Sequence, residues 1–211
     1  MEKNNQREII WKFEANKYFV RNKKTYLNMS SKKFPHLNTT QELISSLYKN
    51  KKLNIAEVGC ANAAFLKLLK KKFKNCDFFG VDPSKLALSF SPKSIKTFRG
   101  TADKTNFKKN SMDIIIYGFC LYLCEIEDHN NIKDEAIRIL KKNGYIVLYD
   151  FYSKNIKKIN YKHDKRIKII KMDFSKIFPK KIFKLIKKKI FYKGKVNREK
   201  NQYSIFVLKK K

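Results

Sequence analysis

Two apolar runs, at residues 112–117 (MDIIIY) and 145–151 (YIVLYDF), constrain the fold of this chain more than any other feature of its sequence. Each is a nearly continuous apolar stretch bounded by polar residues. Such a run is typical of a β-strand buried on both faces, because a strand with one face in water alternates apolar and polar residues. Strands of this kind occur in parallel sheets that helices cover on both sides.

The segments around these runs alternate between strand and helix patterns. The alternation predicts an α/β fold with a doubly wound, mostly parallel sheet. The last helix before the 145–151 strand is expected to stop at Asn143-Gly144, because glycine favours the left-handed conformation that ends helices. The further strands are predicted at residues 53–58, 78–81 and 95–98, and the helices between strands at residues 63–73, 84–90 and 132–140.

Both ends of the chain carry patterns of their own. Residues 8–22 fit a helix, and a second helix is predicted to begin at a cap formed by Thr39-Thr40. Residues 203–208 predict a strand, and residues 166–172 are compatible with one. The segment 180–191 (KKIFKLIKKKIF) spaces its Ile residues as a helix would and equally tolerates a strand, so the pattern leaves both structures open.

The chain is strongly basic, with 50 Lys and Arg against 18 Asp and Glu and a formal net charge of +32. This balance permits binding to phosphate-rich partners, and the basic segment 180–195 permits peripheral contact with an anionic membrane. Nearly all the basic residues are Lys, and they accompany abundant Asn, Ile, Phe and Tyr, as codon use in an AT-rich genome would produce. Nucleic acid is therefore an alternative partner and not the favoured one.

Several compartments and chemistries are disfavoured by what the sequence lacks. No apolar run reaches the roughly 18 residues of a membrane span, and no apolar segment follows the polar N-terminus as in a secretory signal. The four cysteines are scattered through a chain of 211 residues, which is long enough for one domain without disulfides. We expect a cytoplasmic protein with reduced thiols and no metal site, and the sequence does not predict its oligomeric state.

The turn after the first predicted strand, Glu57-Val-Gly59-Cys-Ala61-Asn-Ala63, marks a ligand site. Ligands of open parallel sheets bind at the carboxyl ends of the strands, and small residues there let the backbone approach closely. Asp82 closes the second strand, where a carboxylate can accept hydrogen bonds from ribose hydroxyls. A dinucleotide site is disfavoured, because Ala61 replaces the glycine that makes room for the pyrophosphate and Glu57 would repel it.

These residues resemble the class I S-adenosylmethionine-dependent methyltransferases, and most closely the small type 11 kind, over roughly residues 50–151. NIAEVGCANAAFLKLL is similar to the first motif of the family, FFGVDPS to the acidic motif of the second strand, and GTADKTNF to the loop beside the adenine amino group. SMDIIIYGFCLYL resembles the fourth strand with the loop under the methyl group, and EAIRILKKNGYIVLYDF the following helix and fifth strand. The resemblance implies S-adenosyl-L-methionine as cofactor and a seven-stranded Rossmann-like sheet with an antiparallel C-terminal hairpin.

The resemblance also implies which residues bind the cofactor. Ala61 and Ala63 replace two glycines of the first motif. We interpret them as small enough to leave the site intact, while a degenerate site that does not bind is the alternative. The implied cofactor-binding residues are Glu57, Gly59, Cys60, Ala61, Asn62, Asp82, Pro83, Ser84, Ala102, Asp103, Tyr117, Gly118 and Phe119.

Residues outside the motifs are candidates for binding the acceptor and moving its proton. We divide the chain into an N-terminal helical cap (residues 1–50) and a methyltransferase domain (residues 51–211) with a substrate-lid insertion at about 152–174. His163 in the insertion and Asp150 on the fifth strand are the two candidate bases. His36 is expected to be solvated, and His129 to precede or cap a helix. The candidate substrate-binding residues are Tyr18, Arg21, Tyr122 and Tyr161.

The predicted function is methyl transfer to a small-molecule acceptor. The loop YGFCLY lacks the Asp/Asn-Pro-Pro-Tyr/Phe pattern that positions exocyclic amines, which favours a hydroxyl, and analogy with the family suggests a sugar or related metabolite. Two alternatives stay open. One is an RNA methyltransferase, and the other is a non-catalytic basic protein that binds a membrane or a partner through a degenerate methyltransferase scaffold.

Overall fold

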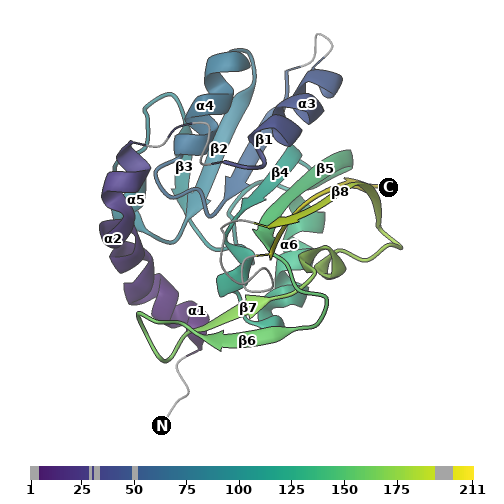
Figure 1. The fold of residues 1–211 in the computed structure, drawn as a ribbon. Coiled ribbons are helices and arrows are strands. Elements are labelled where there is room, and N and C mark those ends of the chain that lie inside the picture. The colour runs from purple at the N-terminus through teal and green to yellow at the C-terminus, as the bar shows by residue number, and fades with distance from the viewer. Residues whose placement is uncertain (1–4, 29, 31–33, 49–51, 193–201) are drawn as a thin grey trace.

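A seven-stranded sheet, in the order β3-β2-β1-β4-β5-β9-β8, forms the centre of the computed structural model, which describes residues 5–28, 30, 34–48, 52–192 and 202–211 (Figure 1). The first five strands are parallel. Strand β9 is antiparallel to β5, and β8 is antiparallel to β9. The strands are β1 (Asn54–Val58), β2 (Asp77–Asp82), β3 (Lys96–Arg99), β4 (Met112–Gly118), β5 (Leu140–Phe151), β8 (Phe183–Tyr192) and β9 (Gln202–Lys210). This topology confirms the predicted mixed sheet with its antiparallel C-terminal pair.

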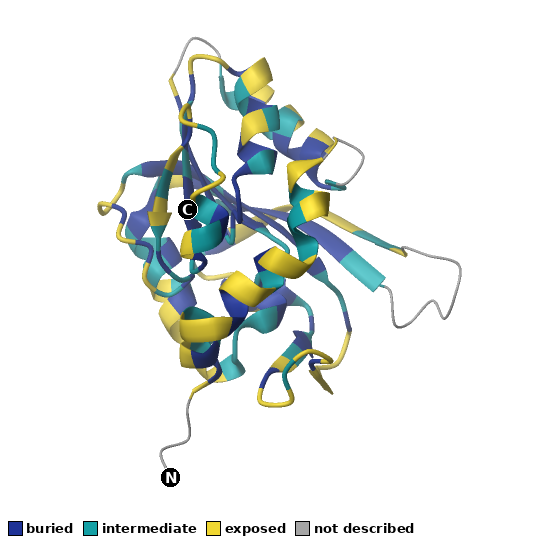
Figure 2. Cartoon of the chain, turned by 90° about the vertical axis from the view of Figure 1, so that its left-hand side faces the viewer, coloured by how far each residue is buried: buried dark blue, intermediate teal, exposed yellow. Residues whose placement is uncertain are grey.

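Helices cover both faces of this sheet, so that the strands are buried and the helices expose their outer sides (Figure 2). One face packs on helices α3 (Leu37–Leu47) and α4 (Ala64–Lys72), and the other packs on α6 (His129–Ile139) and the short turn η5 (Phe174–Ile177). The remaining short elements between strands are α5 (Lys85–Leu88), η3 (Leu121–Leu123) and η4 (Ile126–Asp128).

Packing on both faces explains why strand β4 is apolar from Ile114 to Tyr117. Ile114 and Ile116 pack with the α3–α4 layer, whereas Ile115 and Tyr117 pack with the α6 layer. Successive side chains of a strand point to opposite faces, so both faces of a central strand need apolar residues. All four residues are at most 1% exposed.

The N-terminal segment forms one continuous helical stretch, α1 (Gln6–Ile9), the π-type turn η1 (Ile10–Glu14) and α2 (Ala15–Leu27), as the sequence predicted. It lies along one side of the molecule, where its first turns are next to a separate hairpin of β6 (Lys157–Asn160) and β7 (Lys168–Lys171) (Figure 1). This hairpin lies within the insertion that follows β5. No helix in the described residues is long and apolar enough to cross a membrane.

The segment 180–191, for which the pattern left helix and strand open, contains most of strand β8, because it pairs along β9 at the edge of the sheet. Two local expectations are corrected. Thr39-Thr40 lies inside α3 and does not cap it, since the Thr40 hydroxyl donates to the carbonyl of His36. Helix α6 ends at Ile139, before Asn143-Gly144, and Asn143 adopts the left-handed conformation (φ 61°) that was expected of glycine.

Candidate functional site

Two neighbouring cavities open at the carboxyl ends of the central strands. The first is bounded by the ends of β1 and β2, the loop after β3 and the N-terminal helix. The second is bounded by the end of β4, helix α4, the start of α3 and the aromatic residues of β5 and β9. Tyr18, Tyr26, Gly59 and Phe119 line both cavities, so the two spaces share a wall.

The turn between β1 and α4 brings the backbone to the edge of both cavities. Gly59, Ala61 and Ala63 have φ angles of 76°, 48° and 56°, so the two alanines keep the left-handed conformation that glycine adopts without strain. The N–H groups of Gly59 and Cys60 donate to the carbonyl of Val81 at 2.8 and 3.1 Å. A Cβ on Gly59 would lie 2.5 Å from that of Cys120, so only glycine fits there.

Asp82 ties the end of β2 to this turn. Its Oδ2 accepts a hydrogen bond of 2.8 Å from the N–H of Ala61, and its Oδ1 accepts one of 2.8 Å from the N–H of Ser84. Burial raises the pKa of Asp82 to about 6, although both hydrogen bonds favour the carboxylate. Each oxygen keeps a free lone pair, and Asp82 lines the first cavity.

Glu57 lies near the end of β1 and faces the second cavity. The residue is 3% exposed, and its Oε2 has no hydrogen-bond partner. Burial, with the nearby Asp82, raises the pKa of Glu57 well above its usual range. Asn62 lines the same cavity with its Oδ1 likewise unpartnered. Buried polar atoms without partners are rare in folded proteins, so these two oxygens mark a place for a donor-bearing ligand.

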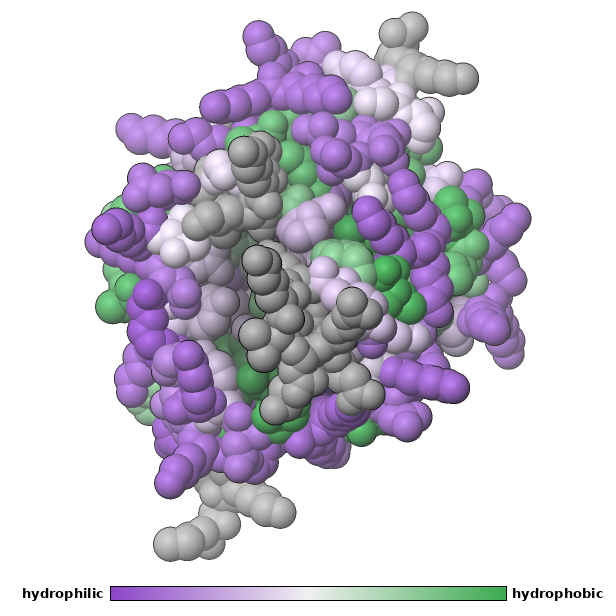
Figure 3. All heavy atoms as spheres, in the orientation of Figure 1, coloured by the Kyte–Doolittle hydropathy of each residue, from purple (hydrophilic) through white to green (hydrophobic). Residues whose placement is uncertain are grey.

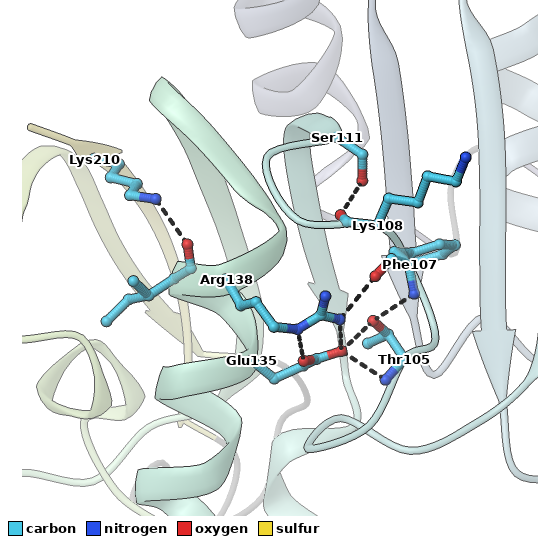
Figure 4. Close-up of polar contacts among 8 residues, drawn as sticks. Thr105, Phe107, Lys108, Ser111, Glu135, Arg138 and Lys210 are labelled. Atoms are coloured by element: carbon cyan, nitrogen blue, oxygen red, sulfur yellow. Dashed lines mark hydrogen bonds and ion pairs between the residues drawn. The ribbon is translucent and has the colours of Figure 1, made fainter.

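The loop after β3 places Asp103 beside the first cavity, where it forms an ion pair with Arg7 of the N-terminal helix. A cluster behind the loop fixes its course (Figure 4). Glu135 of α6 accepts hydrogen bonds from the N–H and hydroxyl of Thr105, at 2.8 and 2.5 Å, and pairs with Arg138. Because Arg138 also donates to the carbonyl of Phe107 at 2.8 Å, the loop is held at two points.

His36 is the most buried histidine at the site, at 1% exposed, although the sequence led us to expect a solvated side chain. It lies at the start of α3 and lines the second cavity. Neither ring nitrogen has a hydrogen-bond partner, and burial lowers its pKa to about 3. Its Nε2 would lie 3.5 Å from a Cβ placed on Gly118, and the Oε1 of Glu57 would lie 2.9 Å from the same point.

The two expected bases lie in different surroundings. His163 is an exposed residue of the loop between β6 and β7 and stacks edge-on against Tyr161. Asp150 is 2% exposed, and its carboxylate accepts hydrogen bonds from the N–H groups of Tyr122 (3.2 Å) and Phe151 (2.7 Å). Burial raises the pKa of Asp150 to about 7. Neither residue lines a cavity, and Asp150 is bonded to the backbone of Tyr122, which lines the first one.

Three further expected residues, Tyr117, Arg21 and Tyr161, line neither cavity. Tyr117 packs against Phe178 in the core, because alternation along β4 turns its side chain to the α6 face. Arg21 pairs with Glu14 and donates to the Tyr161 hydroxyl at 2.9 Å, and that hydroxyl donates to Glu14 at 2.9 Å. Arg21 and Tyr161 thus join the N-terminal helix to the insertion and line neither cavity.

The other expected residues do line the cavities. Those at the first cavity are Tyr18, Gly59, Ala61, Asp82, Pro83, Ser84, Ala102, Asp103, Phe119 and Tyr122, and those at the second are Tyr18, Glu57, Gly59, Cys60, Asn62, Gly118 and Phe119.

The lining residues that the sequence analysis missed include Arg7, His36, Tyr149 and Tyr203. The only sequence signal for His36 was its place among Phe34, Pro35 and Leu37, an apolar setting that favours burial. Arg7, Tyr149 and Tyr203 carried no signal, because only the packing of distant segments brings them to the site. Among the described residues, no group of three or more His, Cys, Asp or Glu side chains could hold a metal ion.

The sequence and the fold were compared with those of known proteins. The family model described as "Methyltransferase domain" matches residues 56–148. No curated protein matches the chain. Among solved structures, the PH0226 protein of Pyrococcus horikoshii is 18% identical with a TM-score of 0.66, over 92% of this chain and 99% of that one.

Two other solved structures share the fold. An S-adenosylmethionine-dependent methyltransferase of Methanosarcina mazei is 14% identical with a TM-score of 0.61, over 79% of this chain and 96% of that one. The 1,6-didemethyltoxoflavin-N1-methyltransferase of Burkholderia thailandensis, solved with its substrate and S-adenosylhomocysteine bound, is 10% identical with a TM-score of 0.67, over 92% and 86%. At these identities the likeness is one of fold.

Proposed function

We propose that this chain transfers the methyl group of S-adenosylmethionine to a hydroxyl of an uncharged small molecule. The chain carries a class I methyltransferase domain of the type 11 kind. The observation that carries this proposal is the second cavity, where His36 holds two buried ring nitrogens without partners beside the cavity that Asp82 lines.

The residues present fit S-adenosylmethionine. Asp82 and Asp103 would hold its nucleoside end in the first cavity, and Glu57 and Asn62 would hold its amino-acid end across the turn at Gly59. The buried carboxylate oxygen of Glu57 suits a cationic group, because an opposite charge offsets the cost of its burial. When bound, the cofactor supplies a methyl group on a positively charged sulfur. The chain's own contribution is to exclude water and to hold both reactants in place.

The charges around the second cavity support an uncharged acceptor. The chain has 50 Lys and Arg, but none of the described residues that line the second cavity is Lys or Arg. Glu57 is the only carboxylic acid among these lining residues. A phosphate-bearing acceptor such as RNA would gain no cationic partner there and would meet a carboxylic acid. None of the described lysines is buried, and hydrophilic side chains cover most of the face seen in Figure 3.

The first experiment tests the cofactor assignment with matched carboxylates at the two ends of β2. Asp82→Asn should weaken binding of S-adenosylhomocysteine by about 10- to 100-fold, because a neutral amide replaces a charged hydrogen-bond acceptor. Asp77→Asn is the control: Asp77 begins the same strand and pairs with Lys52 at 2.9 Å. Calorimetry measures both affinities. Equal affinities in the two variants would contradict the role of Asp82.

The second experiment tests the acceptor. The protein is incubated with methyl-labelled S-adenosylmethionine and a cell extract, and the products are separated on an ultrafiltration membrane that retains RNA and protein. We expect the label in the filtrate, on a methyl carbon bonded to oxygen, as read by carbon NMR. Label that stays with the RNA, and becomes filterable only after ribonuclease treatment, would overturn the proposal in favour of an RNA acceptor.

A further inference from the structure

The second cavity is walled by aromatic rings that lie nearly parallel to one another. The ring of His36 stacks on that of Tyr149, with centroids 4.9 Å apart and planes 19° apart. Tyr149 stacks in turn on Phe119 (5.5 Å, 27°) and on Tyr203 (6.0 Å, 23°). These residues come from four different segments of the chain, and all four line the cavity.

The sheet sets the orientation of these rings. Tyr149 on β5 and Tyr203 on β9 lie on the same sheet face, because Tyr149 pairs with Ile205 and Tyr203 lies two residues away on that strand. Phe119 has a positive φ of 70°, and its N–H donates to the carbonyl of Tyr149 at 2.7 Å, which fixes the loop that carries its ring. The flat wall is therefore built on rigid elements.

His36 brings a polar edge to this wall. Its carbonyl accepts hydrogen bonds of 2.9 Å from the N–H and the hydroxyl of Thr40, so the first turn of α3 holds its backbone in place. Both ring nitrogens are buried and unpartnered. Burial keeps the imidazole neutral above about pH 4, because its pKa is lowered to about 3. A neutral imidazole has one nitrogen that accepts a hydrogen bond and one that donates.

We propose that the second cavity binds a planar aromatic acceptor, and that His36 accepts a hydrogen bond from the hydroxyl to be methylated. In the transfer, the bond from the methyl carbon to the acceptor oxygen would form as the methyl–sulfur bond breaks, which leaves S-adenosylhomocysteine. The hydroxyl proton would pass to the accepting ring nitrogen of His36 and from there to water. This inference rests on the proposed function and narrows its acceptor from hydroxyl compounds in general to phenol-like ones, in place of the sugar that the sequence suggested. Stacked aromatic walls favour a flat π-face. An unpartnered buried nitrogen favours a ligand with a hydrogen-bond donor over one without.

The test uses four small probes on protein saturated with S-adenosylhomocysteine: phenol, anisole, cyclohexanol and methyl glucoside. Phenol has the ring and the donor, anisole lacks the donor, cyclohexanol lacks the planar ring, and methyl glucoside represents sugars. Ligand-observed NMR titration gives each affinity. We expect phenol to bind about five- to tenfold more tightly than anisole or cyclohexanol. A factor of this size corresponds to the loss of one hydrogen bond, for anisole, or of one stacked ring, for cyclohexanol. Methyl glucoside should bind most weakly.

Variants of His36 then assign the hydrogen bond. His36→Phe keeps the stacked ring and loses the nitrogens, so the preference for phenol over anisole should disappear while anisole still binds. His36→Asn keeps a polar group and should retain part of that preference. The control His163→Ala removes the exposed histidine and should change neither affinity. S-adenosylhomocysteine affinity and melting temperature should stay within error in all three, which separates an acceptor contact from a folding defect.

The outcomes separate this inference from the proposed function. Tighter binding of methyl glucoside than of phenol would overturn the aromatic class and leave a hydroxyl acceptor standing. A phenol preference that survives in His36→Phe would overturn the role of His36. Label recovered on RNA in the extract experiment, with phenol still bound through His36, would overturn the proposed function and leave the aromatic site.

Discussion

At the residue scale, the buried carboxylic acids stand out, because a folded protein rarely buries a carboxylate without a cation. Asp150 has its carboxylate held by backbone N–H groups and no cation beside it in the contacts described. Its pKa, raised to about 7 by burial, means that the folded state binds a proton that the unfolded chain releases near pH 4. Asp82 is shifted in the same direction, to about 6, and His36 in the opposite one, to about 3.

The free energy of unfolding should therefore depend on pH through Asp150. Between about pH 4 and 7 the folded state holds the extra proton, so this contribution to stability is present at low pH and is lost as pH rises. We expect wild type to lose about 2–3 kcal/mol relative to Asp150→Asn between about pH 5 and 8. Urea unfolding at both pH values measures it. The exposed Asp134→Asn is the control, and parallel pH profiles for wild type and Asp150→Asn would contradict the shift.

Individual residues were predictable from the sequence where a motif fixes the backbone, and not where packing does. The turn at Gly59 and the strand-end Asp82 were placed correctly, and Ala63 was rightly expected to fit the turn. The same reasoning expected a solvated His36, which is buried, and proposed His163, which is exposed. The apolar neighbours of His36 in the sequence favour burial, but only the packing of distant segments shows that its ring lines a cavity.

At the scale of elements, one glutamine joins the N-terminal helix to the hairpin of β6 and β7. The Gln6 amide donates to the carbonyls of Leu123 (2.7 Å) and Lys168 (3.0 Å), and its Oε1 accepts from the N–H of Lys168 (2.7 Å). Gln6 is 3% exposed, so these bonds are shielded from water. The helix lines the first cavity through Arg7, Glu14 and Tyr18, so the hairpin supports a wall of that cavity.

Gln6→Ala should loosen this junction. Removing three shielded hydrogen bonds should lower the local opening free energy by about 2 kcal/mol. We expect amide hydrogen exchange in β7 to become at least about tenfold faster, while exchange in the central strand β4 stays unchanged. Lys12→Ala, which changes an exposed residue of the same helical stretch, is the control. Unchanged exchange at Lys168 in Gln6→Ala would show that the junction does not depend on this side chain.

Strands and helices could be predicted from the sequence where their burial produces a clear repeat of apolar residues. The strands of the parallel half were located within a few residues, because strands such as β4 are buried on both faces. Strand β8 could not be identified in advance, since six consecutive residues of it are exposed and its letters suit a helix as well. What makes it a strand is pairing with β9, a contact between segments that the local pattern does not contain. Its lysines suit a sheet edge, where charge discourages pairing with another chain.

At the scale of the whole molecule, the net charge of +32 is spread over the surface and kept out of the second cavity. Like charges on a compact body repel one another, and the unfolded chain relieves that repulsion by expanding. Several of the described ion pairs have both partners exposed, where each contributes little. The folded state thus carries an electrostatic cost that dissolved salt can screen.

The melting temperature should therefore rise by a few degrees when sodium chloride increases from about 0.02 M to about 0.5 M, since the Debye length shortens below the spacing of most surface charges. Calorimetric melting at constant pH measures the effect, and sucrose at matched osmolarity is the control for solvent exclusion. A melting temperature that falls with salt would indicate that attractive pairs dominate the surface.

The wall that separates the two cavities belongs to both, because Tyr18, Tyr26, Gly59 and Phe119 line each of them. A ligand that orders Tyr18 or Phe119 on one side prepares the surface that the second ligand contacts on the other. The two dissociation constants are then linked, and by thermodynamic reciprocity each ligand changes the affinity of the other by the same factor. Affinities measured for either ligand alone describe a half-filled protein, and the ternary complex has binding constants of its own.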